Sequence, residues 1–145
     1  MYVIGDGGMR QKLERMAQGD VTFLGRVSNQ AKFEVARKAH LLLVPSVEEG
    51  WGLVVTEANA MGTPAVAYDV AGLRDSVKHD KTGVLTEDNT PQSMANAAVS
   101  LLQDRERLEK LSANALKYAR TFSWDNTARA IEVIKAVASE NYVKR

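Results

Sequence analysis

Two glutamates in the middle of the chain, Glu49 and Glu57, stand in a glycine-rich setting that suits the binding of a hydroxylated ligand. They belong to the segment PSVEEGWGLVVTEANAMGTP, residues 45–64. Gly50 and Gly52 let a ligand approach the backbone, because glycine has no Cβ. The helix expected to follow them would aim its free N–H groups and positive dipole end at that ligand, an arrangement that favours a phosphate group.

Carboxylates beside a phosphate are electrostatically unfavourable, because like charges repel, unless they make another favourable contact. Glu49 and Glu57 would fit if they accept hydrogen bonds from sugar or ribose hydroxyls, and a charged acceptor contributes roughly 1.5–3 kcal/mol per bond. The plainer alternative is that both carboxylates complement a helix N-terminus at the surface, as most exposed carboxylates do. The glycine-rich setting after an apolar strand favours ligand binding.

The composition excludes several classes of protein. A chain of 145 residues is expected to form one domain with a core of its own. With no cysteine it has no disulfide scaffold, thiolate zinc site or thiol nucleophile. A net charge of +1 argues against a nucleic-acid partner. Its apolar runs are too short to span a membrane, so we expect a cytoplasmic protein, either free or associated with a membrane surface.

Short apolar runs alternate with amphipathic stretches, which predicts strands alternating with helices. This alternation is typical of an α/β protein with a Rossmann-like, doubly wound parallel sheet. Such a sheet binds ligands beyond the carboxyl ends of its strands. The strands are expected at residues 2–4, 21–24, 41–44, 65–68 and 83–85, the helices after Met9, at 29–39 and 53–61 and three times in the last third, and the ligand loops at 5–8, 25–28, 46–52 and 69–75.

Rival motifs are incomplete. GDGGMR, residues 5–10, has the Gly-x-Gly spacing of a dinucleotide-binding turn, but Arg10 replaces the third glycine and Asp20 precedes the next strand instead of ending it. His40 and His79 have no partner at metal-ligand spacing, and no Asp-x-Asp pair occurs. The sequence therefore predicts neither a metal ion nor a cofactor.

The segment PSVEEGWGLVVTEANAMGTPAVA, residues 45–67, resembles the signature of the retaining, nucleotide-sugar-dependent glycosyltransferases of family 4, or group 1. Their hallmark is two glutamates separated by seven residues, here Glu49 and Glu57. The resemblance covers essentially the whole chain and implies the C-terminal half of a two-domain GT-B architecture. Further matches follow in the family's order: VIGDGG at 3–8, VTFLGRVS at 21–28, VAGLRDSVKHDKTGVL at 70–85 and FSW at 122–124.

The resemblance implies roles for individual residues. Glu49 would be the catalytic residue and contact hydroxyls of the donor sugar, while Glu57 would hold the ribose hydroxyls of the nucleotide. No residue is expected to bind a metal. The other donor-binding positions are Gly50, Gly52, Leu53 and Val54 at the diphosphate and sugar, Gly25, Arg26 and Val27 near the base, and Gly5 and Gly7 in the turn that floors the cleft.

Similar enzymes carry more chain than this one. They precede the segment at residues 3–8 with a strand and a helix that bear an Arg and a Lys for the pyrophosphate, and with an N-terminal domain for the acceptor. We therefore expect residues 1–145 to be a single nucleotide-sugar-binding domain, a fragment that binds its donor weakly and is inactive alone, with residues 139–145 a frayed tail. The whole enzyme would be a hexosyltransferase whose acceptor is a saccharide, a lipid or a small molecule.

Two alternatives stay open at this point. One is a non-catalytic, Rossmann-like nucleotide-binding module, and the other is a different GT-B enzyme such as a sugar-nucleotide epimerase, although the spacing of Glu49 and Glu57 favours a transferase. The apolar stripes of the last three helices are expected to be core. We also expect that an exposed apolar face of the last helix, which begins near Trp124, drives self-association.

Overall fold

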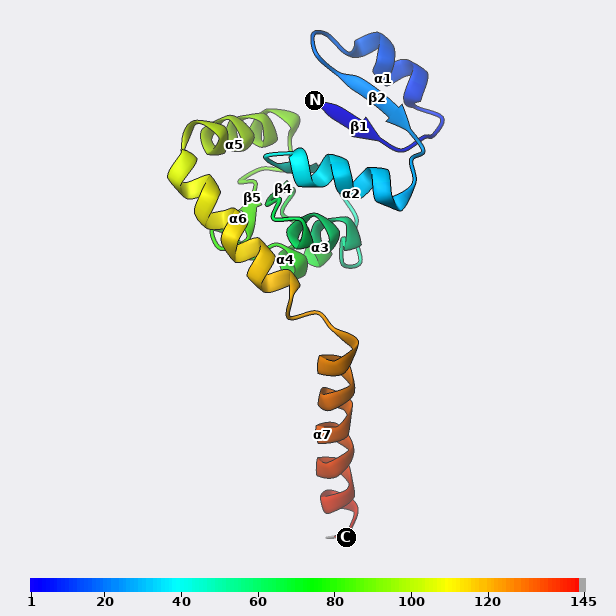
Figure 1. The fold of residues 1–145 in the computed structure, drawn as a ribbon, viewed down its shortest axis with the longest axis vertical. Coiled ribbons are helices and arrows are strands. Elements are labelled where there is room, and N and C mark those ends of the chain that lie inside the picture. The colour runs from blue at the N-terminus through cyan, green and yellow to red at the C-terminus, as the bar shows by residue number, and fades with distance from the viewer. Residues whose placement is uncertain (144–145) are drawn as a thin grey trace. The chain divides into compact units, whose positions relative to one another are not determined.

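In the computed structural model the backbone is described for residues 1–143 and the side chains for residues 1–137. The chain divides into two compact units, residues 1–39 and 40–145. Each unit contains one parallel sheet (Figure 1). The first sheet pairs β1 (Tyr2–Ile4) with β2 (Thr22–Gly25), and the second has the order β3 (Leu42–Val44), β4 (Ala65–Ala67), β5 (Gly83–Leu85).

The first unit adds two helices to its sheet, α1 (Arg10–Met16) and α2 (Asn29–Lys38). Helix α2 begins where the sequence predicts, because Ser28 Oγ accepts a hydrogen bond of 3.2 Å from the amide of Ala31. Within residues 1–39, all of which are described, Gly25 is the one buried residue. The apolar stripe of α1 is exposed, with Met16 at 65%. This unit therefore encloses no apolar core of its own.

The second unit has a core on both faces of its sheet, because alternate residues of β4 point to opposite sides. Val66 packs with Met94 and Leu101 of α5 (Pro91–Gln103) and with α6 (Arg105–Ala119). Ala65 and Ala67 pack with α3 (Leu53–Ala60) and α4 (Ala71–Ser76) through Val55 and Leu73. Helices on both faces of a parallel sheet confirm the predicted α/β fold class.

Two local predictions are wrong. Residues 69–75 were expected to form a loop, but α4 occupies most of that segment, because Leu73 and Ser76 are buried and give the short helix an inner face. The strand at 41–44 is apolar throughout, which is typical of a buried parallel strand, yet Leu43 is 38% exposed. That difference follows from the sheet order, in which β3 pairs on one side only.

The third apolar stripe of the last helices is also not core, contrary to expectation. Helix α7 (Trp124–Val143) leaves Trp124 89% exposed and Ile134 66% exposed. The helix runs through Val143, so the backbone of the expected tail is helical from residue 139 as far as it is described, and residues 144–145 lie outside the described residues. Among the described residues, no helix combines the length and the apolar character needed to cross a membrane.

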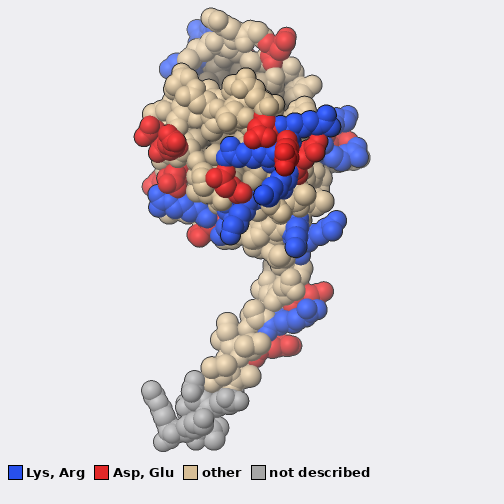
Figure 2. All heavy atoms as spheres, turned by 90° about the vertical axis from the view of Figure 1, so that its left-hand side faces the viewer, with Lys and Arg blue, Asp and Glu red and all other residues tan. Residues whose placement is uncertain are grey.

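Charged side chains of both signs are interspersed on the face shown in Figure 2, and no large patch is purely basic. Ion pairs account for part of this mixture. Arg105 Nε lies 2.8 Å from Glu109 within α6, and Arg107 of the same helix pairs with Asp80 in the turn before β5.

Candidate functional site

The loop between β3 and α3 ends in what we call the glycine turn, residues 49–52. Gly52 is the N-cap of α3 and has a φ of +77°, a conformation that glycine adopts far more readily than other residues. A Cβ added to Gly52 would lie only 2.8 Å from Leu73 Cδ2. Both the backbone angle and the available space therefore require glycine at this position.

The N-terminus of α3 carries no capping side chain, and its first turn contains no acidic residue. Ser28, Thr90 and Asp104, in contrast, cap α2, α5 and α6 with their side-chain oxygens. The first amides of α3 therefore keep the partial positive charge of a helix N-terminus. Leu53 is 72% exposed and Val54 39% exposed, so this end of the helix is accessible to a ligand.

Both predicted carboxylates belong to this segment, and both are half-buried. Glu49 Cγ lies 3.5 Å from the position of a Cβ on Gly52, so the Glu49 side chain runs along the glycine turn. Glu57 stands four residues after Leu53, in the second turn of α3. Glu49 thus belongs to the glycine turn, while Glu57 belongs to α3.

Aromatic residues brace the glycine turn. Trp51 Nε1 donates a hydrogen bond of 3.0 Å to Thr56 Oγ1, and its ring meets Phe122 edge-on at 5.5 Å between centroids. Phe122 packs in the same way on Tyr118 at 4.9 Å, and the Tyr118 hydroxyl donates to the carbonyl oxygen of Asp75 at 3.1 Å. The FSW motif thus contributes Phe122 as a wall of the turn.

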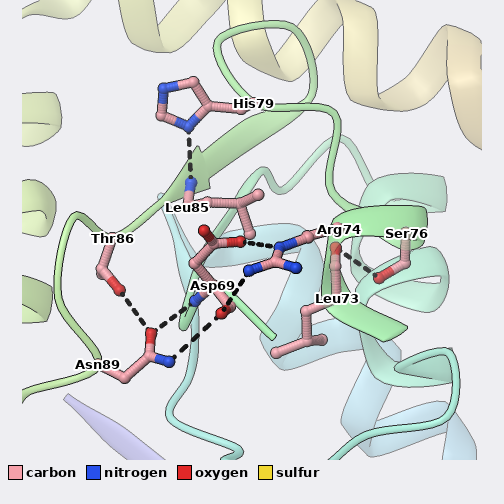
Figure 3. A network of polar contacts seen from close by, with 8 residues as sticks. All are labelled: Asp69, Leu73, Arg74, Ser76, His79, Leu85, Thr86 and Asn89. Carbon is pink, nitrogen blue, oxygen red and sulfur yellow. Dashed lines mark hydrogen bonds and ion pairs between the residues drawn. The ribbon is translucent and has the colours of Figure 1, made fainter. Parts of the chain in front are cut away.

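Polar contacts fix the carboxyl end of β4, which lies at the same edge of the sheet as the end of β3 (Figure 3). Arg74 Nε donates to Asp69 Oδ1 at 2.5 Å, and this contact raises the pKa of Arg74 above its usual range. Asn89 Oδ1 accepts from the Asp69 amide at 2.7 Å, and Asn89 Nδ2 donates to the Asp69 carbonyl at 3.3 Å. Asn89 follows β5, so these contacts tie together the exits of two neighbouring strands.

In the first unit, Gly5 and Gly25 bring the ends of β1 and β2 together. The Gly5 amide donates a hydrogen bond of 2.8 Å to the Gly25 carbonyl, and Gly25 has a φ of +66°. Arg10 Nη1 lies 2.6 Å from the position of a Cβ on Gly25, so the guanidinium covers this glycine. A small cavity of about 290 Å³ beside β1 is lined by Gly5, Gly7 and Arg10 among others.

The predicted site residues fall into two groups that belong to different units. Within the second unit the structure brings together the glycine turn and the start of α3, and within the first it brings together the ends of the two strands. Among the described side chains, no three or more His, Cys, Asp or Glu residues are grouped as metal ligands would be. The first group is Glu49, Gly50, Gly52, Leu53, Val54 and Glu57, and the second is Gly5, Gly7, Gly25, the exposed Arg26 and the half-buried Val27.

Sequence reasoning did not find the braces. Neither Trp51 nor Asn89 is among the site residues predicted from the sequence. Their partners are distant in the sequence, so no local pattern connects Trp51 to Phe122 or Asp69 to Asn89.

The family described as "Glycosyl transferases group 1" matches residues 1–118. The chain belongs to this family. The D-inositol 3-phosphate glycosyltransferase of Rhodococcus erythropolis is 38% identical over 122 residues, which are 84% of this chain and 28% of that protein. The enzyme of the same name from Jonesia denitrificans is 44% identical over 92 residues, 63% of this chain and 22% of that protein. The chain thus spans about a quarter of the length of these group 1 relatives.

Solved structures share the fold. Sucrose-phosphate synthase from Thermosynechococcus elongatus superposes with a TM-score of 0.80 at 27% identity, over 96% of this chain and 38% of that protein. Anabaena HepE, solved in complex with UDP-glucose, gives a TM-score of 0.75 at 22% identity, over 95% of this chain and 40% of that one. The chain therefore has the α/β fold with parallel strands that is found in GT-B glycosyltransferases of group 1.

Proposed function

We propose that residues 1–145 form one donor-binding domain of a retaining family 4 glycosyltransferase, and that the whole enzyme moves a sugar from a nucleotide diphosphate to an acceptor hydroxyl. The observation that carries the proposal is the uncapped N-terminus of α3, with Glu49 lying against Gly52. Membership of group 1 and the names of the curated relatives support transfer as the reaction.

Sugar transfer of this kind requires stabilisation of the departing nucleotide diphosphate, which is an anion. The bond from the anomeric carbon to the diphosphate oxygen breaks, and its electron pair leaves with the diphosphate. The acceptor oxygen forms the new bond to the anomeric carbon, and its proton leaves to the departing diphosphate or to solvent. Backbone amides of Gly52, Leu53 and Val54 at the N-terminus of α3 are suited to the charge that grows on the diphosphate.

The carboxylates then act as hydrogen-bond acceptors. Glu49, on the glycine turn, receives hydroxyls of the donor sugar and orients its anomeric carbon. Glu57, on α3, receives the ribose hydroxyls. The roles expected of the first unit belong to the same proposal: backbone groups of residues 25–27 meet the base, and Gly5 and Gly7 lie in the turn after β1. Donor binding needs no metal ion or cofactor in this scheme, because a helix N-terminus supplies positive charge.

The domain is incomplete as a catalyst in this proposal. A preceding strand and helix would supply the Arg and Lys for the pyrophosphate, and an N-terminal domain would bind the acceptor. We expect residues 1–145 to bind donor in the millimolar range, about −4 kcal/mol, and to transfer nothing alone.

An amide chemical-shift titration tests the proposal. The ligands are UDP, GDP, ADP, their sugar conjugates and NAD. Donor binding predicts shifts at residues 25–28 and 49–57 with one base preferred. Shifts at residues 5–8 with NAD alone would contradict it in favour of a dinucleotide site. If no ligand has an effect, the same titration of a longer chain that includes the preceding strand and helix decides the question.

The remaining partners and the location belong to the same proposal. The interspersed charges in Figure 2 support the absence of a nucleic-acid partner on that face. The exposed apolar face of α7 supports self-association of the fragment. We place the whole enzyme in the cytoplasm, either free or attached to a membrane surface, and cell fractionation of the whole protein would test this.

A further inference from the structure

We propose that Gly72, in the first turn of α4, is a positioning residue that sets the place of the glycine turn and hence of Glu49. This inference rests on the proposed function, because it concerns the turn that receives the donor sugar. Gly72 does not touch the ligand in this scheme. It acts through the backbone of residues 49–50, which lies directly against it.

The contact between Gly72 and the turn leaves no space for a side chain. A Cβ added to Gly72 would overlap the Glu49 carbonyl oxygen and lie 2.6 Å from the Gly50 carbonyl carbon. Gly72 is buried and its φ is not positive, so the lack of space, not the backbone angle, requires glycine here. A single methyl group must therefore displace either the turn or α4.

The other end of the glycine turn also rests on α4. Leu73 Cδ2 lies 2.8 Å and Ser76 Oγ 3.3 Å from the position of a Cβ on Gly52. The helix thus contacts the turn near both of its ends, residues 49–50 and residue 52. A change in the relative position of helix and turn moves the whole turn, including the Glu49 side chain.

Helix α4 is the better anchored of the two. Leu73 is fully buried in the core. Just before the helix, the Asp69 carbonyl accepts hydrogen bonds from Asn89 and Arg74, and Arg74 also donates to the Asp69 carboxylate (Figure 3). Tyr118 donates to the Asp75 carbonyl. Residues 49–52 belong to no helix or strand, so a methyl group on Gly72 is expected to displace the turn instead of the helix.

The displacement should separate the two carboxylates in function. Glu49 belongs to the turn and would lose its alignment with the sugar hydroxyls. Glu57 lies in the second turn of α3, whose Val55 is fully buried, and it would keep its place at the ribose. Gly72→Ala is therefore expected to remove the gain in affinity that the sugar provides, while the affinity for the bare nucleotide stays near that of the wild type.

The test compares UDP with UDP-glucose on the wild-type chain and on Gly72→Ala by amide chemical-shift titration. We expect the affinity ratio of UDP-glucose over UDP to fall about tenfold, the size of one lost charged hydrogen bond. In the absence of ligand, the amides of residues 49–52 should also shift, which reports displacement of the turn directly.

Gly83→Ala is the matched control. A Cβ on Gly83 would overlap the Ala65 carbonyl oxygen and lie 3.1 Å from the Ala65 amide nitrogen. Both residues stand at the amino ends of their strands, away from the glycine turn. This variant adds the same methyl group in a similarly crowded place. It should lower the melting temperature and leave the affinity ratio unchanged.

A Gly72→Ala protein that folds but keeps the wild-type ratio, or that loses affinity equally for both ligands, would overturn the positioning role. If this variant does not fold, Leu73→Val removes both Cδ atoms, one of which lies beside Gly52, and it should lower the ratio part of the way. An unchanged ratio there also overturns the role. Should the wild type bind neither ligand in any form, the proposed function fails, while the ligand-free shifts still decide whether Gly72 positions the turn.

Discussion

Glu57 and Glu49 accept hydrogen bonds from different parts of the donor in the proposed scheme, so removing each should have a different signature. Glu57→Ala should weaken UDP and UDP-glucose alike, by about tenfold, because the ribose is common to both ligands. The titration that measures both affinities checks this. Glu48→Ala, which removes an exposed neighbouring carboxylate, is the control and should change neither affinity. A Glu57→Ala protein with wild-type affinity for UDP would refute the ribose assignment.

Glu49→Ala should instead act on the sugar. The side chain runs along the glycine turn, beside Gly52, and leaves the rest of α3 untouched. We expect the affinity for UDP-glucose to fall about tenfold and that for UDP to stay within about twofold. Isothermal titration of the two ligands measures both. Equal losses would mean that Glu49 senses the nucleotide and not the sugar.

At the scale of elements, an ion pair links α6 to the turn before β5. Arg107 donates a hydrogen bond to Asp80, and this contact lowers the pKa of Asp80 below its ordinary value of 3.8. The carboxylate form is favoured in the folded state, so the stabilisation is present above pH 3.8 and is lost as the pH falls below it, through the lowered folded-state pKa. Part of the chain's acid sensitivity should therefore come from this pair.

Arg107→Gln tests that link. It should lower the free energy of unfolding at pH 7 by about 0.5 kcal/mol, since the pair is partly exposed. The variant should also lose less stability than the wild type when the pH falls below 4, because the ion pair is already absent. Urea denaturation at a series of pH values measures both effects. Arg105→Gln is the matched control, because Arg105 is 90% exposed and its partner among the described residues, Glu109, lies on the same helix. An identical acid profile in the Arg107 variant would contradict the assignment.

Elements with strong local signals could be predicted from the sequence. Ser28 is a typical capping residue and stands directly before α2, and Gly62 followed by Pro64 is a typical stop signal just after α3. Helix α4 could not be predicted in this way. Val70 offers no capping side chain, and Gly72 disfavours a helix, so that helix exists because Leu73 is buried in the core.

The local segment of the candidate site could be predicted from the sequence, but the distant residues that hold it in place could not. The two glutamates and Gly52 belong to one short segment, and the structure gives Gly52 the positive φ of a helix cap. The contacts that hold the segment come from Phe122 and Gly72, which are distant in the sequence and carry no pattern of their own. The apolar stripe of α7 was predicted correctly as a pattern but wrongly as core. Periodicity indicates that a helix has an apolar face, but it does not indicate which partner covers that face.

For the whole molecule, exposed apolar surface on α7 leads to a prediction about its association. Trp124, Ile131 and Ile134 are 89%, 47% and 66% exposed on one side of this helix. Burial of such residues between copies should make the molecular mass measured by light scattering fall on dilution. Ile134→Glu should shift that transition to higher concentration. Val99→Glu on α5, where the residue is 51% exposed, serves as the control. A mass that stays monomeric at all concentrations would exclude self-association.

The surroundings of the two tryptophans give the molecule an optical reporter of its own. Trp51 is held against Phe122 and Thr56 inside the bracing of the glycine turn, while Trp124 is almost fully in solvent. Replacing Trp124 by phenylalanine would leave a single indole whose emission depends on the turn alone. Its fluorescence would then follow the arrival of a sugar nucleotide without any added label, and rapid mixing would time the rearrangement of the turn around each donor.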